Sequence, residues 1–338
     1  MRQWKIHEGL SAPVNVTWEI TRQCNLSCIH CLSDAGRDKG EELTYDQCLH
    51  VIDQLSSHQV FQVNFGGGEP FMRKDFLSIL DACHRKDLVT CISTNGTFLD
   101  DEALDFLGGK KMVYLQVSLD GGSPQTNDPI RGRGSYDDVV EALDRLNSRK
   151  VPFSINTVLT RMNYLEISSL YSFARRYGAK LRVSRFRPSG RGKDSWEALR
   201  LEKEDLKAFS QWLSDHRDVV TGDSFFSLED EERKGLGLNL CGAAKFTCCV
   251  DPEGRVYPCA FLQDSSFYGG SILNQSLGEI WSHAHGFKVL RNLKVRSCES
   301  CFRFESCHGG CPAVAYFTGK SLNIADPECL VHCIQPVS

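Results

Sequence analysis

The sequence predicts an α/β fold, a partial (β/α)6 TIM-like barrel followed by a small, cysteine-rich α+β domain. Short apolar runs alternate with amphipathic segments of helix length up to about residue 225, and such alternation implies a parallel sheet with right-handed crossovers. Beyond that point the periodic segments give way to Gly, Cys and turn residues. We therefore expect an N-terminal segment at 1–13, the barrel at 14–225 and the second domain at 226–338.

Six strand–helix units make up the expected barrel. The strands are the apolar runs at 14–20, 61–67, 89–96, 112–121, 152–160 and 180–188. The helices are the amphipathic segments at 44–58, 73–86, 100–108, 135–150, 163–178 and 202–217. Thr44 and Gln47 fit a capping box, and Ser135 is the expected cap of the fourth helix, with Asp138 three residues later. In the second domain, 245–259 predicts a β-hairpin with its turn at 251–254.

Composition excludes several classes of protein. The chain has 338 residues, 41% hydrophobic and 24% charged, with a net charge of −4, which is ordinary for a globular protein of about two domains. A slightly acidic chain has no basic surface for nucleic acid or anionic lipid. The N-terminus has no apolar signal region, and no apolar run is long enough to span a membrane. We expect a cytoplasmic protein with no nucleic-acid or membrane partner.

The sixteen cysteines are unusual for such a protein. In a small secreted chain they would form disulfides. Here they are crowded at C-x2-C and C-x3-C spacings, near the start and after residue 240. Such spacings favour metal or iron–sulfur ligation in a reducing compartment.

Cys24, Cys28 and Cys31 lie within eight residues, directly after the first expected strand. A structural zinc site needs four ligands, so an incomplete zinc site or three unrelated thiols is the alternative interpretation. Three thiolates instead suit a four-iron cluster with one iron left open. The C-x3-C-x2-C spacing, with the aromatic His30 before the last cysteine, resembles the radical S-adenosylmethionine (SAM) superfamily.

This resemblance implies a [4Fe-4S] cluster on the three cysteines, with SAM bound at the open iron. It implies contacts to SAM from His30, from Gly67, Gly68 and Glu69 in "GGGEP", from Ser118 and Asp120 in "SLDG", and from Arg131. The glycines let the backbone approach the methionine moiety, and the Glu69 carboxylate suits its ammonium group. Arg131 would pair with the SAM carboxylate, and the alternative for this arginine is a solvated loop charge.

Seven cysteines of the second domain resemble the SPASM/twitch pattern of peptide-modifying radical SAM enzymes. The resemblance implies two auxiliary iron–sulfur clusters, expected as [4Fe-4S], with interleaved ligands. The first would use Cys241, Cys259 and Cys311, and the second Cys298, Cys301, Cys307 and Cys329.

The remaining cysteines include one possible further ligand. Family members with a fully ligated first auxiliary cluster carry an extra cysteine just upstream of the Cys241 position, and this chain has none there. The cluster then either has an open iron or uses Cys248, which would share a hairpin face with Cys259, while Cys249 points to the opposite face. Cys48, Cys83 and Cys91 are expected in the apolar core, and Cys333 has no assigned role.

Five longer strings resemble one branch of this family, the mycofactocin maturases. They are "VNFGGGEPFMRKDF", "RFRPSGRGKDSW", "TGDSFFSL", "LNLCGAAKFTCCVDPEGRVYPCAF" and "ADPECL". The resemblance implies action on the C-terminal Val-Tyr of a short ribosomal peptide: oxidative decarboxylation of the Tyr, then a Val–Tyr carbon–carbon bond. Arg185, Arg187 and Arg191 are candidate contacts for the peptide's terminal carboxylate, unless they form a solvated basic loop.

The expected partners follow from this activity. They are the precursor peptide, an electron donor such as a flavodoxin or ferredoxin, and a small leader-binding chaperone protein, because segment 1–13 is too short for a peptide-binding domain. Three alternatives stay open: another SPASM maturase that makes a thioether or other crosslink, a haem-pathway decarboxylase, or a non-catalytic iron–sulfur electron carrier. An electron carrier needs no open iron, which disfavours the last.

Overall fold

A computed structural model describes residues 10–36, 40–221, 225, 241–302 and 304–330. One nine-stranded sheet runs through it, in the order β6-β5-β4-β3-β2-β1-β7-β8-β9. The strands are β1 (Asn15–Thr21), β2 (Gln62–Gly67), β3 (Val89–Thr94), β4 (Val113–Ser118), β5 (Phe153–Leu159), β6 (Lys180–Arg185), β7 (Thr247–Val250), β8 (Arg255–Tyr257) and β9 (Gly270–Ser271). Strands β1 to β6 pair in parallel, so the predicted partial (β/α)6 barrel is confirmed.

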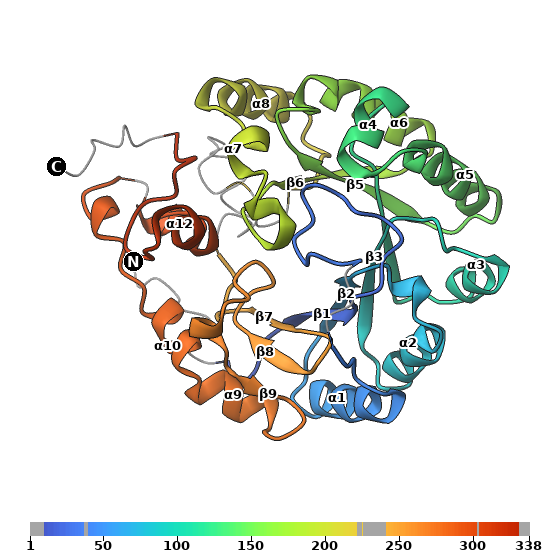
Figure 1. The fold of residues 1–338 in the computed structure, drawn as a ribbon. Helices are drawn as coiled ribbons and strands as arrows, with labels where there is room; N and C mark the ends of the chain where they lie inside the picture. The colour runs from blue at the N-terminus through green and yellow to red at the C-terminus, as the bar shows by residue number, and fades with distance from the viewer. Residues whose placement is uncertain (1–9, 37–39, 222–224, 226–240, 303, 331–338) are drawn as a thin grey trace.

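Helices line the outer side of the curved sheet (Figure 1). Those of the barrel are α1 (Tyr45–Ser57), α2 (Phe76–Arg85), α3 (Asp101–Gly108), α4 (Pro124–Arg131), α5 (Ser135–Ser148), α6 (Ile167–Arg176), α7 (Trp196–Leu199) and α8 (Lys203–Asp215). The C-terminal part adds α9 (Leu277–His283), α10 (His285–Arg291), α11 (Phe304–Cys307) and α12 (Pro312–Gly319). None of the helices in the described ranges is long and apolar enough to cross a membrane.

The helix caps predicted from the sequence are only partly confirmed. The capping box of Thr44 and Gln47 is present at α1. The predicted cap at Ser135 is wrong: Gly134 takes the cap position with φ +82°, and the Ser135 hydroxyl accepts a hydrogen bond from Asn127 inside the protein. Helix α4 was not expected, because its sequence PQTNDPIR has no apolar period and contains an internal proline.

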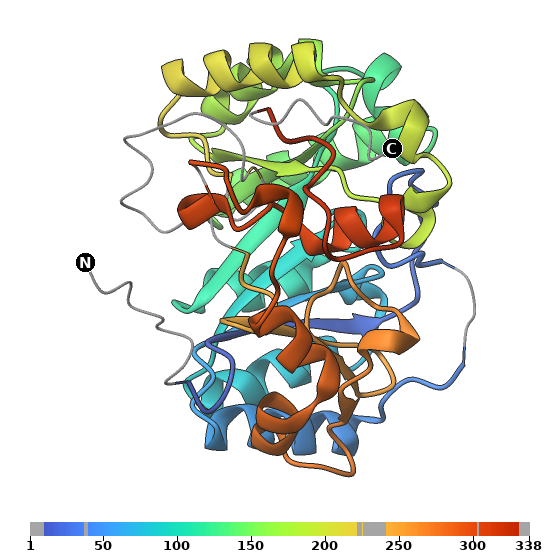
Figure 2. The same ribbon diagram turned by 90° about the vertical axis from the view of Figure 1, so that its left-hand side faces the viewer.

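The C-terminal hairpin joins the barrel sheet instead of forming a separate one. β7 and β8 form the predicted antiparallel hairpin, with Cys249 opposite Tyr257. However, β7 also pairs in parallel with β1, from Asn15–Thr247 to Trp18–Val250. The later C-terminal elements lie across the open side of the barrel between β1 and β6 (Figures 1 and 2). The proposed domain boundary at 225–226 adjoins residues 226–240, outside the described residues, and stays a prediction.

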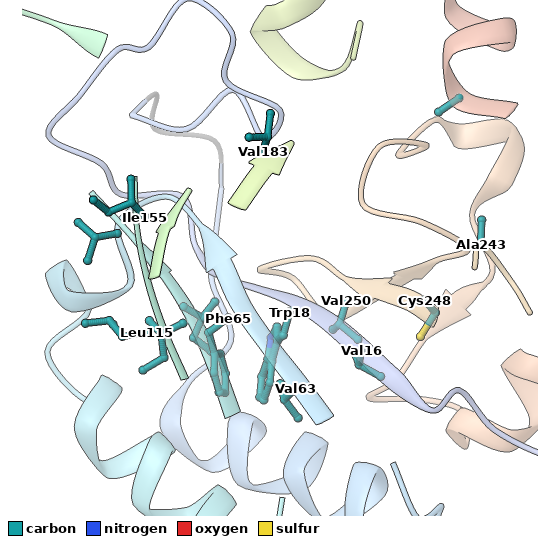
Figure 3. Packing of buried hydrophobic residues seen from close by; sticks show 14 of the residues in the cluster. Val16, Trp18, Val63, Phe65, Leu115, Ile155, Val183, Ala243, Cys248 and Val250 are labelled. Atoms are coloured by element: carbon teal, nitrogen blue, oxygen red, sulfur yellow. The ribbon is translucent and has the colours of Figure 1, made fainter. Parts of the chain in front are cut away.

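The two faces of the sheet differ in polarity. Side chains toward the helices are apolar and buried, and Figure 3 shows Val16, Trp18, Val63 and Phe65 among them. The alternate residues form what we call the inner face. It is mostly polar and partly exposed, with Thr17, Asn64, Gly66, Ser93, Gln116, Ser118, Asn156, Arg182 and Ser184. An inner face this polar is suited to a ligand, not to a dry barrel core.

The aromatic contact between β1, β2 and α2 gives a test of this packing. Phe65 is 1% exposed and lies 5.6 Å from the Trp18 ring and 5.4 Å from the Phe76 ring, measured between centroids. Phe65→Ala should lower the free energy of unfolding by about 3–5 kcal/mol, because it leaves a cavity in the core. Phe61→Ala, at a position 62% exposed, is the control and should change it by less than about 0.5 kcal/mol. Anaerobic urea unfolding measures both, and equal effects would contradict this packing.

Candidate functional site

The three-cysteine loop leaves the end of β1 and lies over the inner face of the barrel (Figure 1). Backbone bonds hold it, from Ile29 N to Ile130 O (3.0 Å) and from Gly36 N to Arg22 O (2.9 Å). Burial raises the pKa of the Cys28 thiol to about 11; Arg131 opposes this rise, and the neighbouring Cys31 and Cys24 add to it. The three thiols therefore lie together in a place where only a bound cation would favour their thiolate forms.

The glycines at the end of β2 pack directly under this loop. A Cβ on Gly67, which has φ +99°, would lie 2.6 Å from the Thr21 carbonyl oxygen, and one on Gly68 would lie 2.0 Å from that of Gln23. Both positions therefore require glycine. Gly66, which the sequence analysis did not single out, faces open space with nothing within 4 Å. That space is on the inner face beside the cysteine loop.

Glu69 is buried beneath the cysteine loop, and its carboxylate is hydrogen-bonded to protein groups. Its carboxylate accepts bonds from Thr94 Oγ1 (2.7 Å), Asn95 N (2.7 Å) and Phe71 N (3.2 Å). Burial nevertheless raises its pKa to about 7. A contact with the ammonium group of SAM would favour the ionised form, and that contact stays a prediction.

His30, Asp120 and Arg131 form a buried group behind the loop. Asp120 Oδ2 lies 2.8 Å from His30 Nε2 and 2.7 Å from Arg131 Nε, and its other oxygen accepts a bond from Val158 N (2.7 Å). Burial works against ionisation of Asp120, but Arg131, His30 and the Val158 bond outweigh it and lower its pKa to about 2. Arg131 is 6% exposed, so it is not a solvated loop charge. If Arg131 also binds the SAM carboxylate, as predicted, it must do so while it keeps its ion pair with Asp120.

The residues around the loop fit a cluster with SAM. Open space lies next to Gly66, Ser93 is exposed although it lies inside a central strand, and Ser118 is half-buried at the end of β4. The Nδ1 atom of His30 is buried with no hydrogen-bond partner among the described residues. Within the described ranges, no three His, Cys, Asp or Glu side chains lie close enough together to bind a single metal ion.

The C-terminal cysteines gather in two groups. Burial raises the pKa of Cys259, and the neighbouring Cys241 and Cys311 raise it further. Burial raises the pKa of Cys298 to about 11; the Ser297 hydroxyl opposes this, and Cys307, Cys329 and Cys301 add to it. These are the two interleaved sets that the SPASM resemblance implies. That each set holds a cluster stays a prediction. All fifteen described cysteines are free thiols, and Cys333 lies outside the described residues.

The structure does not bring Cys248 to the first of these groups. Its thiol lies in the main apolar core (Figure 3), since alternation along β7 turns it away from the inner face. The predicted hairpin register is wrong: Cys249 pairs with Tyr257, so Cys249, not Cys248, shares the face of Cys259. Burial raises the pKa of the Cys249 thiol, with Glu19 and the neighbouring Cys259 adding to the rise, and Gln263 Nε2 lies 3.8 Å from its sulfur. Cys48 and Cys83 belong to the apolar core. The same prediction is wrong for Cys91, which lies on the inner face, where its thiol accepts a bond from Gln116 Nε2 (3.1 Å).

Two of the three candidate arginines already bind groups of the protein. Arg185 is buried and makes two 2.6 Å bonds to Asp326 and an ion pair with Glu328. Arg191 donates to Cys28 O (3.0 Å) and to Asp34 (2.8 Å), so it holds the cysteine loop. Arg187 lies over the Phe261 ring, 4.2 Å from its centroid. The interpretation as a solvated basic loop is therefore wrong for these residues, because each is at least partly buried against a partner.

Glu19 links two cysteine segments, and the sequence analysis missed it. This β1 residue accepts bonds from Ser33 Oγ (2.8 Å) and Gln263 Nε2 (2.8 Å). Ser33 follows Cys31 and Gln263 follows Cys259 in the sequence. An isolated acidic residue in an otherwise apolar strand was the signal that could have found it.

Comparisons with known proteins agree with this geometry. Residues 18–174 match the family model of the radical SAM superfamily, and residues 241–308 match that of an iron–sulfur cluster-binding domain. The structure of Streptococcus suis SuiB bound to precursor peptide SuiA has the same fold, with a TM-score of 0.79 and 20% identity, over 96% of this chain and 77% of that one. Fold and cysteine groups thus define a radical SAM protein with a SPASM domain.

Sequence similarity to characterised proteins identifies the family within this class. Mycofactocin maturase MftC of Mycolicibacterium smegmatis is 42% identical over 332 residues, which cover 96% of this chain and 85% of the relative. An AdoMet-dependent heme synthase of Methanosarcina barkeri is 28% identical, over 95% of this chain and 97% of the relative. The chain belongs to the mycofactocin maturases, a family of peptide-modifying radical SAM enzymes.

The buried Glu19 predicts a pH dependence of stability. Burial raises its pKa from 4.5 to about 7, although Ser33 and Gln263 oppose the rise. A raised pKa in the folded state means that the contribution to stability is complete below pH 4.5 and is lost as the pH rises to about 7. The free energy of unfolding of Glu19→Gln should therefore increase relative to that of the parent as the pH rises through this range, by up to about 3 kcal/mol in total. Above about pH 7 the difference should stay constant. Urea unfolding at a series of pH values measures the difference, and a difference independent of pH would contradict the buried acid.

The Arg185 ion pairs predict a structural effect. Arg185→Gln leaves Asp326 and Glu328 buried without their cation, and should cost about 3–5 kcal/mol. Arg200→Gln is the control, because Arg200 forms exposed pairs with Glu197 and Glu202 and should cost less than about 1 kcal/mol. Anaerobic unfolding and the iron content report the loss. A normally stable Arg185 variant with weakened peptide binding would instead restore Arg185 as a substrate contact.

Proposed function

We propose that this protein acts on the C-terminal Val-Tyr of a ribosomally made precursor peptide in mycofactocin biosynthesis. It would first decarboxylate the terminal Tyr oxidatively and then join Val and Tyr through a carbon–carbon bond. The observation that carries the proposal is the open three-thiol loop over a polar inner face, in a chain 42% identical to a mycofactocin maturase.

SAM and the iron–sulfur clusters would supply the redox chemistry of this reaction. When bound, SAM and the cluster at Cys24, Cys28 and Cys31 supply reductive SAM cleavage and hydrogen abstraction from the Tyr side chain, and the auxiliary clusters supply an acceptor for the electron left when CO2 departs. In balance, the peptide loses one CO2 and two hydrogens, and a carbon–carbon double bond forms in the Tyr residue.

The protein's own residues would position the reactants and exclude water. Glu69 and His30 line the SAM side, where the close approach of Gly67 and Gly68 keeps the loop against β2. Asp120 holds His30 and Arg131 in place from within the core. The C-terminal elements cover the open side of the barrel (Figure 2), which would shield a reactive intermediate from solvent.

Several partners belong to this proposal. SuiB, which shares the fold, binds a precursor peptide, and a precursor peptide is the substrate proposed here. A leader-binding chaperone protein and an electron donor such as a flavodoxin or ferredoxin would complete the system. A cytoplasmic location stays a prediction from the sequence.

The reaction can be tested directly. A precursor ending in Val-Tyr, supplied with its leader-binding partner, SAM and reductant, should lose CO2 and two hydrogens from the Tyr residue, as measured by mass spectrometry. The amidated precursor should not react, because no CO2 can leave. The combined Cys24→Ala, Cys28→Ala and Cys31→Ala variant is the control and should neither react nor form 5′-deoxyadenosine.

Other products would identify the alternatives. A thioether or other crosslink would indicate a different SPASM maturase. An unchanged peptide together with decarboxylation of a haem precursor would indicate the haem-pathway alternative. SAM left uncleaved by the reduced, cluster-loaded protein would indicate an electron carrier.

A further inference from the structure

Arg182 lies on the inner face, on the strand farthest from β1 in the barrel sheet. It belongs to a cross-strand row in which Ser118 pairs with Asn156 and Asn156 pairs with Arg182. Neighbouring strands are about 4.8 Å apart, so the Cα atoms of Ser118 and Arg182 are about 10 Å apart. A side chain as long as arginine can span much of that distance across the inner face.

The Arg182 guanidinium has no acidic partner within the described ranges of the chain. Its Nε atom is buried and makes no hydrogen bond, and no salt bridge involves this residue among the described residues. Arg182 lies close enough to act on Cys91: burial raises the pKa of this thiol and Arg182 opposes the rise. Glu19, the acidic residue of the inner face, lies on β1 and is bonded to Ser33 and Gln263. Arg182 is half-buried, and a cation that is partly removed from water favours binding of an anion.

The other residues of the row, Ser118 and Asn156, are polar and could donate hydrogen bonds to a bound carboxylate. Asn156 accepts a bond from Ser184 Oγ (2.9 Å), which leaves its amide NH2 group available as a donor. Arg185 and Arg191 are bonded within the protein. Arg182, by contrast, forms no ion pair with any described residue, so it can bind an anion in the open part of the inner face.

We propose that Arg182 binds the C-terminal carboxylate of the peptide substrate and selects for a free peptide end. This inference rests on the proposed function and specifies how its substrate is recognised. The contact favours the carboxylate over neutral CO2, so it contributes to binding and positioning and not to the loss of CO2 itself. Decarboxylation removes the anion, and with it this contact, so the peptide end is released from Arg182 before the second step.

The test measures binding without turnover. Cluster-loaded protein with SAM and no reductant is titrated with a short leaderless peptide ending in Val-Tyr, as the free acid and as the amide. The parent protein should bind the free acid more tightly than the amide by about 30-fold or more, the loss expected when one partner of a buried charge pair is removed. Arg182→Gln should bind both peptides equally, at the level of the amide, and Arg182→Lys should keep part of the preference.

Two controls separate a binding role from a structural one. Lys180→Gln removes a charge from an exposed position two residues earlier on the same strand and face, and it should keep most of the preference for the free acid. Because Arg182 forms no ion pair with the described residues, Arg182→Gln should melt at or above the temperature of the parent and keep its iron.

Each contrary outcome overturns the inference. A variant that still prefers the free acid, or one that unfolds and loses iron, would overturn the role of Arg182. A parent protein that converts the Val-Tyr precursor but binds acid and amide equally would do the same and leave the proposed function intact. Failure of the parent to convert the precursor at all would overturn the proposed function, and the inference with it.

Discussion

The parallel pairing of β1 with both β2 and β7 is the constraint on which the rest of the molecule depends. The cysteine loop leaves the end of this strand, and the hairpin that precedes Cys259 lies beside it. Trp18 and Val16 fix the register by facing the apolar core, and Glu19 faces inward. A slip of one residue would exchange these faces. One strand therefore determines the positions of both the SAM-side thiols and the first auxiliary group.

Buried charges then attach the cysteine segments to this frame. Asp120 holds Arg131, whose carbonyl oxygen lies 3.7 Å from the Cys28 sulfur, and Asp326, held by Arg185, accepts a bond from Cys311 N (2.9 Å). Ion pairs of this kind contribute little net stability when the cost of desolvation is included. Their effect here is geometric: each one fixes a thiol-bearing segment against an element that is distant in the sequence.

The sequence predicted what local patterns determine. Alternation predicted the six strand–helix units, and the resemblance to radical SAM and SPASM enzymes implied the three cysteine groups that the structure brings together. It did not predict that β7 would pair with β1, because a contact between residues more than two hundred positions apart leaves no local signal. The partners of Arg185 and Arg191 were missed for the same reason. A basic segment does not indicate whether its side chains are solvated or form ion pairs with buried acidic residues. Cys91 was misplaced because a single cysteine in a strand does not indicate which face it occupies.

The arrangement of the arginines suggests how such a protein separates scaffold from substrate recognition. Arg131, Arg185 and Arg191 have partners supplied by the chain, and they hold loops that must keep their geometry while reactants change. The position of Arg182 is fixed by β6, but no acidic side chain in the described part of the chain pairs with it. Within a peptide of ordinary composition, only Asp, Glu and the chain end bring a carboxylate, and only the chain end brings one attached to the α-carbon. A cation on the inner face would therefore favour the terminal residue over internal ones, and its contact with the peptide would end once that carboxylate has left as CO2.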